Sequence, residues 1–268
     1  MMVLCFYKYQ GTGNDFILID NRKQPGINYT TALIQHLCDR RFGIGADGLI
    51  LLQNHQQYDF EMVYYNANAS QSLCGNGSRC AVHLARSLNM IGTKTRFLTI
   101  NGVYQAAIKD AIISLHLKDV PAIQPLGTDY FVDTGSPHYV QLVDDVAKLD
   151  VMALGQSISN RQAFQKAGTN VNFVQVTGKN TIFVRTYERG VEAETLSCGT
   201  GAIAASLVAA TKGLMSPIAV ATKGGQLQVC FKVSPQGFTA IHLIGPAVMS
   251  FQGAININMA QFAMKNLL

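Results

Sequence analysis

Short apolar runs separated by polar or glycine-rich segments recur along most of the chain, a pattern typical of β-strands. The first two runs cover residues 3–9 and 16–20 and flank a glycine-rich turn at residues 10–15. A second glycine-rich turn, at residues 43–48, precedes an apolar run at residues 49–52. Further strands are predicted at residues 60–66, 130–133, 139–143, 182–187, 218–222, 226–233 and 238–243, and from 97 to 117 with a reversal at Lys109–Asp110. The chain is therefore predicted to be rich in strands.

Helical spacing interrupts this pattern in a few segments. The run that follows Cys74 carries its apolar residues on one face. The run that follows Cys198 is apolar almost all round from Ala202 to Ala210, so we expect this helix to be buried within its domain. Other helices are predicted from Thr30 or Thr31 to Arg41, near residues 150–159, and at residues 259–268.

A short motif, Cys-Gly-X-Gly, occurs twice in the chain. It begins at Cys74 and again at Cys198. Each copy follows a strand-like run and a polar loop, and each opens one of the two helix-like runs. With 268 residues the chain has room for two domains of ordinary size. The sequence therefore indicates an internal duplication, with one cysteine at the start of a helix in each half.

A thiol at the N-terminal end of a helix faces unpaired backbone N–H groups and the positive end of the helix dipole. This environment stabilises thiolate and lowers a cysteine pKa from about 8.5 towards neutrality. The glycines of the motif would also let a carboxylate approach the same N–H groups. A single free cysteine is most often an inert core residue. Two in matched helix starts favour a chemical role for both Cys74 and Cys198.

Composition and charge exclude several classes of function. Charged residues make up 14% of the chain and hydrophobic residues 48%, which is typical of a compact globular protein. The net charge of +5 is spread without a basic stripe, so no nucleic-acid partner is expected. The first residues lack the features of a signal peptide and no apolar run is long enough to cross a bilayer. We therefore expect a cytoplasmic protein without a membrane partner.

The cysteines also argue against disulfides and metal. The six cysteines contain no CxxC pair, and a reducing compartment disfavours disulfides. Cys74, Cys80 and His83 have a spacing that is not usual for zinc ligands. No metal site is predicted.

The best candidate for a domain boundary is the segment Val120–Gly127, which holds two prolines and a glycine. The N-terminal domain is therefore predicted to comprise residues 1–124 and the C-terminal domain residues 125–258. We expect the terminal helix, residues 259–268, to pack back against the N-terminal domain.

Six motifs, taken in their order along the chain, resemble a known family. They are GTGNDF (Gly11–Phe16), GIGADG (Gly43–Gly48), CGNGSRC (Cys74–Cys80), TGSPH (Thr134–His138), TNVNF (Thr169–Phe173) and YERGVEAETLSCGTGA (Tyr187–Ala202). The chain resembles the diaminopimelate epimerases, amino-acid epimerases that use two cysteines and no cofactor. The resemblance runs nearly end to end.

The resemblance implies a fold, a reaction and partners. The fold is α/β (α+β), with two similarly built domains related by a pseudo-two-fold axis. Each domain wraps strands around a central helix, and the active site lies between them. The reaction is cofactor-independent epimerisation of LL-diaminopimelate to meso-diaminopimelate, which feeds lysine and peptidoglycan precursor synthesis. The partner is this small-molecule substrate, and a homodimer is a further expectation.

The resemblance also implies roles for individual residues. Cys74 and Cys198 would be the acid and the base, and His138 and Glu188 would tune their pKa values. Arg189 suits a bidentate grip on the distal carboxylate of the substrate. The residues that would bind the substrate are Asn14, Asn66, Gly75, Asn76, Asn170, Glu188, Arg189, Gly199 and Thr200.

The chain departs from the family pattern near the distal part of the substrate. Gly48 stands where some relatives bind with Gln, and Ser136 where some bind with Asn. The loop between Asn66 and Cys74 is one residue shorter than in many members. The thiol pair itself is unchanged.

Other functions remain open on the sequence alone. A racemase or epimerase of another amino acid, of the proline, hydroxyproline or histidine type, would share the paired cysteines. A thiol redox protein or cysteine-nucleophile hydrolase would need a resolving cysteine or a His–Asn pair for one thiol, and it leaves the duplication unexplained. A binding module without catalysis would exchange no substrate hydrogen with solvent.

Overall fold

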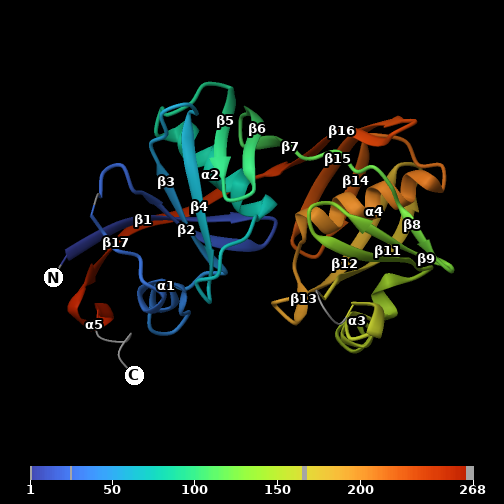
Figure 1. The fold of residues 1–268 in the computed structure, drawn as a ribbon, viewed down its shortest axis with the longest axis horizontal. Helices are drawn as coiled ribbons and strands as arrows, with labels where there is room; N and C mark the ends of the chain where they lie inside the picture. Colours follow the sequence, from blue (N-terminus) through green and yellow to red (C-terminus); the bar gives the residue numbers. More distant parts are fainter. Residues whose placement is uncertain (1, 25, 165–167, 264–268) are drawn as a thin grey trace. The chain divides into compact units, whose positions relative to one another are not determined.

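The computed structural model describes residues 2–24, 26–164 and 168–263 (Figure 1). The chain forms two compact units. Unit 1 comprises Met1–Ile113 and Pro246–Leu268, and unit 2 comprises Ser114–Gly245. The chain thus leaves unit 1 earlier than the predicted boundary at residue 124 and returns to it before residue 259.

The Pro-containing segment that suggested the boundary belongs to unit 2. Gln124–Leu126 forms β8, which pairs antiparallel with β9 (Asp129–Asp133). Val120 makes an isolated antiparallel bridge to Phe238. A proline removes only its own N–H, so a segment that carries one can still pair with a neighbouring strand.

Unit 1 wraps a ladder of strands around one helix, α2 (Gly75–Ser87). Its strands are β1 (Met2–Gly11), β2 (Asn14–Asp20), β3 (Gly48–Gln53), β4 (Phe60–Asn66), β5 (Lys94–Thr99), β6 (Gly102–Lys109) and β17 (Val248–Ile257), and β7 (Ile112–His116) continues into unit 2. The β2–β3 and β4–β5 pairs are parallel, and β17–β1, β1–β2, β3–β4 and β5–β6 are antiparallel.

Unit 2 is built around α4 (Gly199–Thr211) in the same way. Its further strands are β10 (Pro137–Leu142), β11 (Asn170–Gly178), β12 (Thr181–Glu188), β13 (Ala193–Thr195), β14 (Ile218–Thr222), β15 (Gly225–Ser234) and β16 (Gly237–Pro246). The β10–β11 and β12–β14 pairs are parallel, and β9–β10, β11–β12 and β14–β15 are antiparallel. From β1 to β6 and from β9 to β15 the ladders therefore follow the same order of antiparallel and parallel pairs, which supports the duplication.

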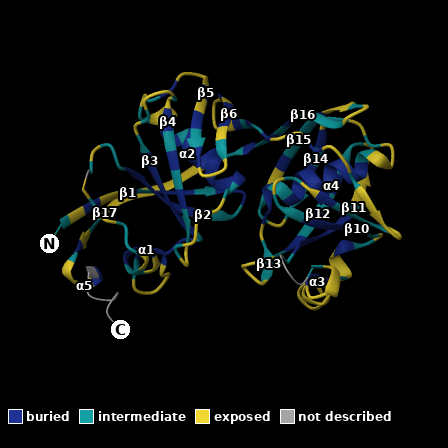
Figure 2. Ribbon diagram, in the orientation of Figure 1, coloured by how far each residue is buried: buried dark blue, intermediate teal, exposed yellow. Residues whose placement is uncertain are grey.

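The two central helices are buried for most of their length (Figure 2). Residues 75–82 of α2 and residues 201–209 of α4 are all buried. In α4 nearly every position is apolar and small, so strands can approach it from all sides, as expected from the sequence. Ser206 satisfies its hydroxyl by donating to the carbonyl oxygen of Ala202 at 2.8 Å.

The helices α1 (Thr31–Cys38) and α3 (Val151–Ser159) pack through apolar clusters of their own. Thr30 caps α1, since its hydroxyl accepts the N–H of Leu33. The helix ends at Cys38 and not at the predicted Arg41, because Asp39 adopts an extended conformation. In the glycine-rich turn that follows, the N–H groups of Ile44 and Gly45 donate to the carbonyl of Leu37. Two 3-10 turns lie beside α3, at Val146–Lys148 and Gln162–Phe164.

The chain end returns to unit 1 through β17, a strand that the apolar pattern did not predict. β17 runs antiparallel to β1 from the pair Met2–Ile257 to the pair Gln10–Val248. Most of its residues are exposed, so it buries little apolar surface. Helix α5 (Ala260–Ala263) follows, and Phe262 packs in the α1 cluster with its ring 5.1 Å from that of His36. The rest of the predicted terminal helix, residues 264–268, lies outside the described residues.

Candidate active site

Cys74 is the N-cap of α2. Its backbone is extended, with φ −124° and ψ 113°, and its Sγ accepts the N–H of Gly77 at 3.4 Å. Gly77 is tightly enclosed, since a Cβ there would lie 3.0 Å from the side chain of Ile50. Gly75 and Asn76 follow the cap as the first helical residues, and their N–H groups belong to the helix end that attracts anions. The thiol therefore sits at the positive end of the helix, as the sequence predicted.

Cys198 repeats this arrangement at the start of α4. Its φ of −115° and ψ of 115° match those of Cys74, and its Sγ accepts the N–H of Gly201 at 3.4 Å. The hydroxyl of Thr200 lies 3.5 Å from the same sulfur. Gly199 and Thr200 are the first helical residues here. The two halves of the chain thus present a thiol in the same local geometry.

At the α2 mouth the loop that joins β1 to β2 is tied to the helix. The side-chain amide of Asn76 donates to the Oδ1 of Asn14 at 2.8 Å, and that of Asn14 donates to Asp47 at 2.6 Å. Asp47 also accepts Arg40 at 2.8 Å. Arg40 in turn pairs with Asp15 at 2.6 Å. The predicted residues Asn14 and Asn76 are therefore held beside Cys74 by a charged network.

Asn66, at the end of β4, is fixed by its own loop and by a tyrosine that the sequence analysis did not single out. Its amide donates to the hydroxyl of Ser70 at 2.9 Å, and Tyr64 donates to its Oδ1 at 3.0 Å. Tyr64 also fills the space at Gly48. A Cβ at Gly48 would lie 2.5 Å from a ring carbon and 2.8 Å from the hydroxyl of Tyr64. The small residue at position 48 thus accommodates the tyrosine ring.

In unit 2 the start of β11 brings several predicted residues together. Asn170 donates to the hydroxyl of Ser136 at 3.0 Å and to the carbonyl of Pro137 at 3.3 Å. The Oδ1 of Asn170 accepts the backbone N–H of Arg189 at 3.1 Å. Glu188, the last residue of β12, accepts the hydroxyl of Thr195. The amide orientation of Asn170 is settled by the Pro137 carbonyl, which can only accept.

His138 lies opposite Asn170 in the parallel β10–β11 ladder and is completely buried. Burial, helped by the charge of Arg189, lowers the pKa of His138 to about 3, so the ring is neutral at physiological pH. The amide of Asn172 donates to the carbonyl of Tyr139 at 3.0 Å, so this nitrogen also donates to His138 Nδ1, at 3.1 Å. The ring proton is therefore on Nε2, which has no hydrogen-bond partner among the described residues. A neutral N–H donor is thus available in unit 2.

The structure also bears on a further cysteine, on metal binding and on membrane-spanning helices. Burial raises the pKa of Cys80 to about 12, so this thiol stays protonated. Among the described residues no group of three or more His, Cys, Asp or Glu side chains could hold a metal ion. No helix in the described part of the chain is long and apolar enough to cross a membrane.

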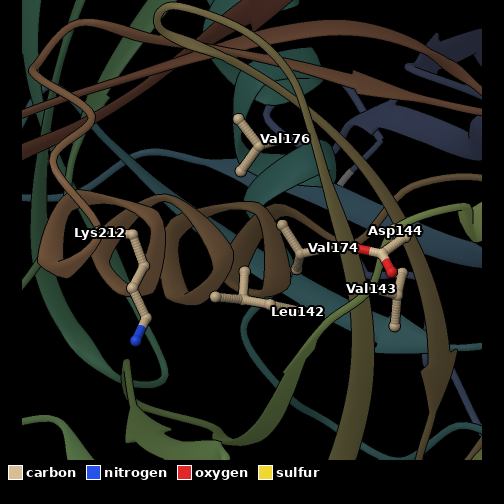
Figure 3. A pocket seen from close by; sticks show the side chains of 6 residues that line it. All are labelled: Leu142, Val143, Asp144, Val174, Val176 and Lys212. Carbon is tan, nitrogen blue, oxygen red and sulfur yellow. The ribbon is translucent and has the colours of Figure 1, made fainter.

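One surface pocket of unit 2 lies away from Cys198. It has a volume of about 320 Å³ and is lined by Leu142, Val143, Asp144, Val174, Val176 and Lys212 (Figure 3). Lys212 is the C-cap of α4, whereas Cys198 is its N-cap. A helix of 13 residues spans roughly 20 Å, so the pocket is at the opposite end from the thiol.

Comparison with known proteins places this chain in a family. The family model described as diaminopimelate epimerase matches residues 6–114 and 130–250. A diaminopimelate epimerase of Flavobacterium psychrophilum is 50% identical over 253 residues, which cover 93% of this chain and 99% of the relative. That of Aquifex aeolicus is 38% identical over 281 residues, which cover 96% and 99%.

The chain belongs to the diaminopimelate epimerase family. It is therefore an isomerase, as the motifs predicted. Solved structures with lower identity share its mixed α/β fold. A phenazine biosynthesis protein of the PhzF family from Bacillus anthracis has a TM-score of 0.75 at 13% identity, over 96% of this chain and 100% of its own. A hydroxyproline epimerase from Agrobacterium vitis has a TM-score of 0.66 at 14% identity, over 94% of this chain and 92% of its own.

Proposed function

We propose that Cys74 and Cys198 are the two acid–base groups of a diaminopimelate epimerase. The observation that carries this proposal is the matched cap geometry, in which each sulfur is 3.4 Å from a glycine N–H at the start of a buried helix. One thiolate removes the α-proton and the other thiol returns a proton to the opposite face of the same carbon. Sulfur acts as a base only as thiolate, which both helix ends stabilise.

The α-proton of an amino acid is a very weak acid, so the protein must stabilise the charge that develops when the proton leaves. We assign this role to the N–H groups of Gly75, Asn76, Gly199 and Thr200. A single donor of this kind is typically worth about 3 kcal/mol in the transition state. We further propose that the neutral His138 and Glu188 tune the pKa values of the thiols.

Asn14, Asn66, Asn170 and Arg189 would recognise the rest of the substrate, and Glu188 its ammonium group. Support comes from the hydrogen bonds that hold three of the four beside their helix mouth or strand end: Asn14 to Asn76, Asn66 to Tyr64, and Asn170 to Arg189. An Arg fork suits the distal carboxylate, which distinguishes diaminopimelate from substrates with one carboxylate. The product would serve lysine synthesis. A cytoplasmic location and a homodimer are further proposals from the sequence.

Incubation of the purified chain with LL-diaminopimelate in deuterated water, without any cofactor, tests the function. We expect the meso isomer to form with deuterium at the inverted carbon, as read by chiral chromatography and mass spectrometry. Proline, hydroxyproline and histidine are the matched comparison substrates. Turnover of one of these with none of diaminopimelate would reassign the substrate. Absence of hydrogen exchange into any of them would reject catalysis.

A further inference from the structure

Arg79 is a completely buried guanidinium in the second turn of α2. Among the described residues its hydrogen-bond acceptors are neutral oxygens. Nη2 donates to the Thr12 hydroxyl at 3.1 Å, Nε to the Pro246 carbonyl at 3.3 Å and Nη1 to the Gly75 carbonyl at 3.5 Å. No carboxylate within 4 Å pairs with Arg79 in the described part of the chain. A buried charge without a counter-ion is costly, so its retention calls for an explanation.

Other charges near this end of α2 cancel or are absent. Lys8 of β1 pairs with Asp15 of β2 at 2.7 Å, and Arg40 pairs with both Asp15 and Asp47, so two cations meet two carboxylates. Burial raises the pKa of both Tyr9 and Cys80 to about 12, so both are neutral. Burial lowers the pKa of His83, which favours its neutral form. Within the described residues, no carboxylate therefore balances the charge of the Arg79 guanidinium at this end of α2.

The neighbours of Arg79 that can carry a negative charge are both thiols. Burial lowers the pKa of Arg79, whereas Cys80 and Cys74 raise it, so a thiolate on either would stabilise the guanidinium. Cys80 stays protonated because it is fully buried. Cys74 is partly exposed and caps the helix that carries Arg79. A guanidinium stays protonated even when it is buried, so its charge is always present at this mouth.

We propose that Arg79 acts as the positioning charge that makes Cys74, and not Cys198, the thiolate of the substrate-free protein. This inference rests on the proposed two-thiol reaction and names the base that starts it. The matching position in α4, five residues after its cysteine, is Ile203, which carries no charge. The groups around the α4 mouth are neutral His138 and Asn172, with the opposite charges of Glu188 and Arg189 at the end of β12.

The proton balance of a turnover follows from this asymmetry. The resting protein holds Cys74 as S⁻ and Cys198 as S–H. Cys74 takes the α-proton, and the electron pair of the broken C–H bond stays on the substrate carbon. This carbon then takes the proton of Cys198. The protein is left with Cys74 as S–H and Cys198 as S⁻. Loss of a proton from Cys74 to solvent and gain of one by Cys198 restore the resting state, and the charge of Arg79 favours this return.

The backbone near Arg79 adopts a conformation that holds the guanidinium in one place. Thr12 has a φ of 52°, which is unusual for a β-branched residue and costs roughly 1–3 kcal/mol. The Thr12 hydroxyl accepts a hydrogen bond from Arg79 Nη2 and donates to the carbonyl of Gly11 at 2.8 Å. A Cβ at Gly11 would lie 3.4 Å from the Arg79 guanidinium. The loop at Gly11 and Thr12 therefore packs directly against the Arg79 guanidinium.

The test is the pH dependence of alkylation by iodoacetamide in the substrate-free protein, resolved for each cysteine by peptide mass spectrometry. In this reaction the thiolate sulfur bonds to carbon and iodide leaves. We expect Cys74 to become reactive at a lower pH than Cys198. In Arg79→Met the midpoint for Cys74 should rise by about one pH unit or more, since a nearby opposite charge has an effect of this size. Arg79→Lys should keep most of the effect.

Ile203→Met is the matched control in α4 and should move neither profile. The Cys198 profile should also stay unchanged in Arg79→Met, which shows that the variant is folded. Arg79→Gln gives a second neutral side chain if Met is not tolerated. An unchanged Cys74 midpoint in a folded neutral variant would overturn the proposal, and so would earlier reaction of Cys198 in the unaltered protein. Because alkylation needs no turnover, a protein that lacks epimerase activity but shows these profiles would contradict only the proposed function.

Discussion

Replacement of each cysteine by Ala and by Ser separates the chemistry of the thiols from their role as helix caps. In Cys74→Ala one sulfur–N–H cap bond is lost, which costs about 1 kcal/mol. Cys198→Ala should cost about 2 kcal/mol, since this side chain is also buried, with 8% exposed. Ser is a good N-cap, so both Ser variants should be as stable as the unaltered chain.

Activity should follow a different order from stability. A positioned acid or base contributes about 10²- to 10⁴-fold to a rate, and inversion needs both groups. Each Ala and each Ser variant should therefore lose epimerisation by about 10³-fold or more. Proton removal from one face needs only the remaining cysteine, once it is in its thiolate form. Each Ala variant should then still eliminate a leaving group from the β-carbon of a substrate analogue, but from one α-configuration only.

The assays are urea unfolding followed by circular dichroism, chiral chromatography of diaminopimelate, and elimination from the two isomers of the analogue. The two Ala variants should prefer opposite configurations. If Cys74→Ala and Cys198→Ala process the same configuration, the paired-thiol reasoning is wrong. Epimerisation near the original rate in a Ser variant would contradict it as well.

Other expected outcomes concern stability and ionisation. Arg40 and Lys8 hold the pKa of Asp15 at about 2, below its usual 3.8, although burial alone would raise it. The ionised carboxylate therefore stabilises the fold above pH 3.8, and this effect is lost as the pH falls towards 2. The difference in the free energy of unfolding between the unaltered chain and Asp15→Asn, measured in urea, should shrink over that range and stay constant above it. Gly48→Ala should destabilise by about 2 kcal/mol through its clash with the Tyr64 ring and with the backbone carbonyl of Tyr65. Tyr64→Ala should relieve the part of this cost that the ring causes, and additive effects would refute the clash with the ring. The pKa of a buried His138 is about 3, so its NMR ring signals should not titrate between pH 5 and 8; a midpoint near 6.5 would contradict burial.

The sequence by itself determined most of the local structure and the place of the two thiols. Short-range chemistry explains this success. The helix starts at Cys74 and Cys198 follow from glycine-rich caps, and the apolar run at Ala202–Ala210 could only be a buried helix. The family was equally readable, because each of its motifs is a short stretch of contiguous sequence. The match to family models and relatives confirmed it.

The tertiary structure decided what depends on partners far along the chain. Strand β17 (Val248–Ile257) is mostly exposed, and its pairing with β1 defines it as a strand. The Pro-rich segment at 120–127 looked like a linker because two prolines disfavour regular structure, yet part of it pairs with β9.

The same holds for the environment of the candidate site. Arg79 reads as an ordinary polar residue of a helix, and only the closure of Thr12 and Pro246 over it leaves the guanidinium fully buried. From the sequence, Gly48 indicates the loss of a side chain that contacts substrate in some relatives. In the fold, the ring of Tyr64 occupies the space that a side chain at position 48 would need. Burial and charge compensation are sums over residues distant in sequence, so the pattern of the chain could not supply them.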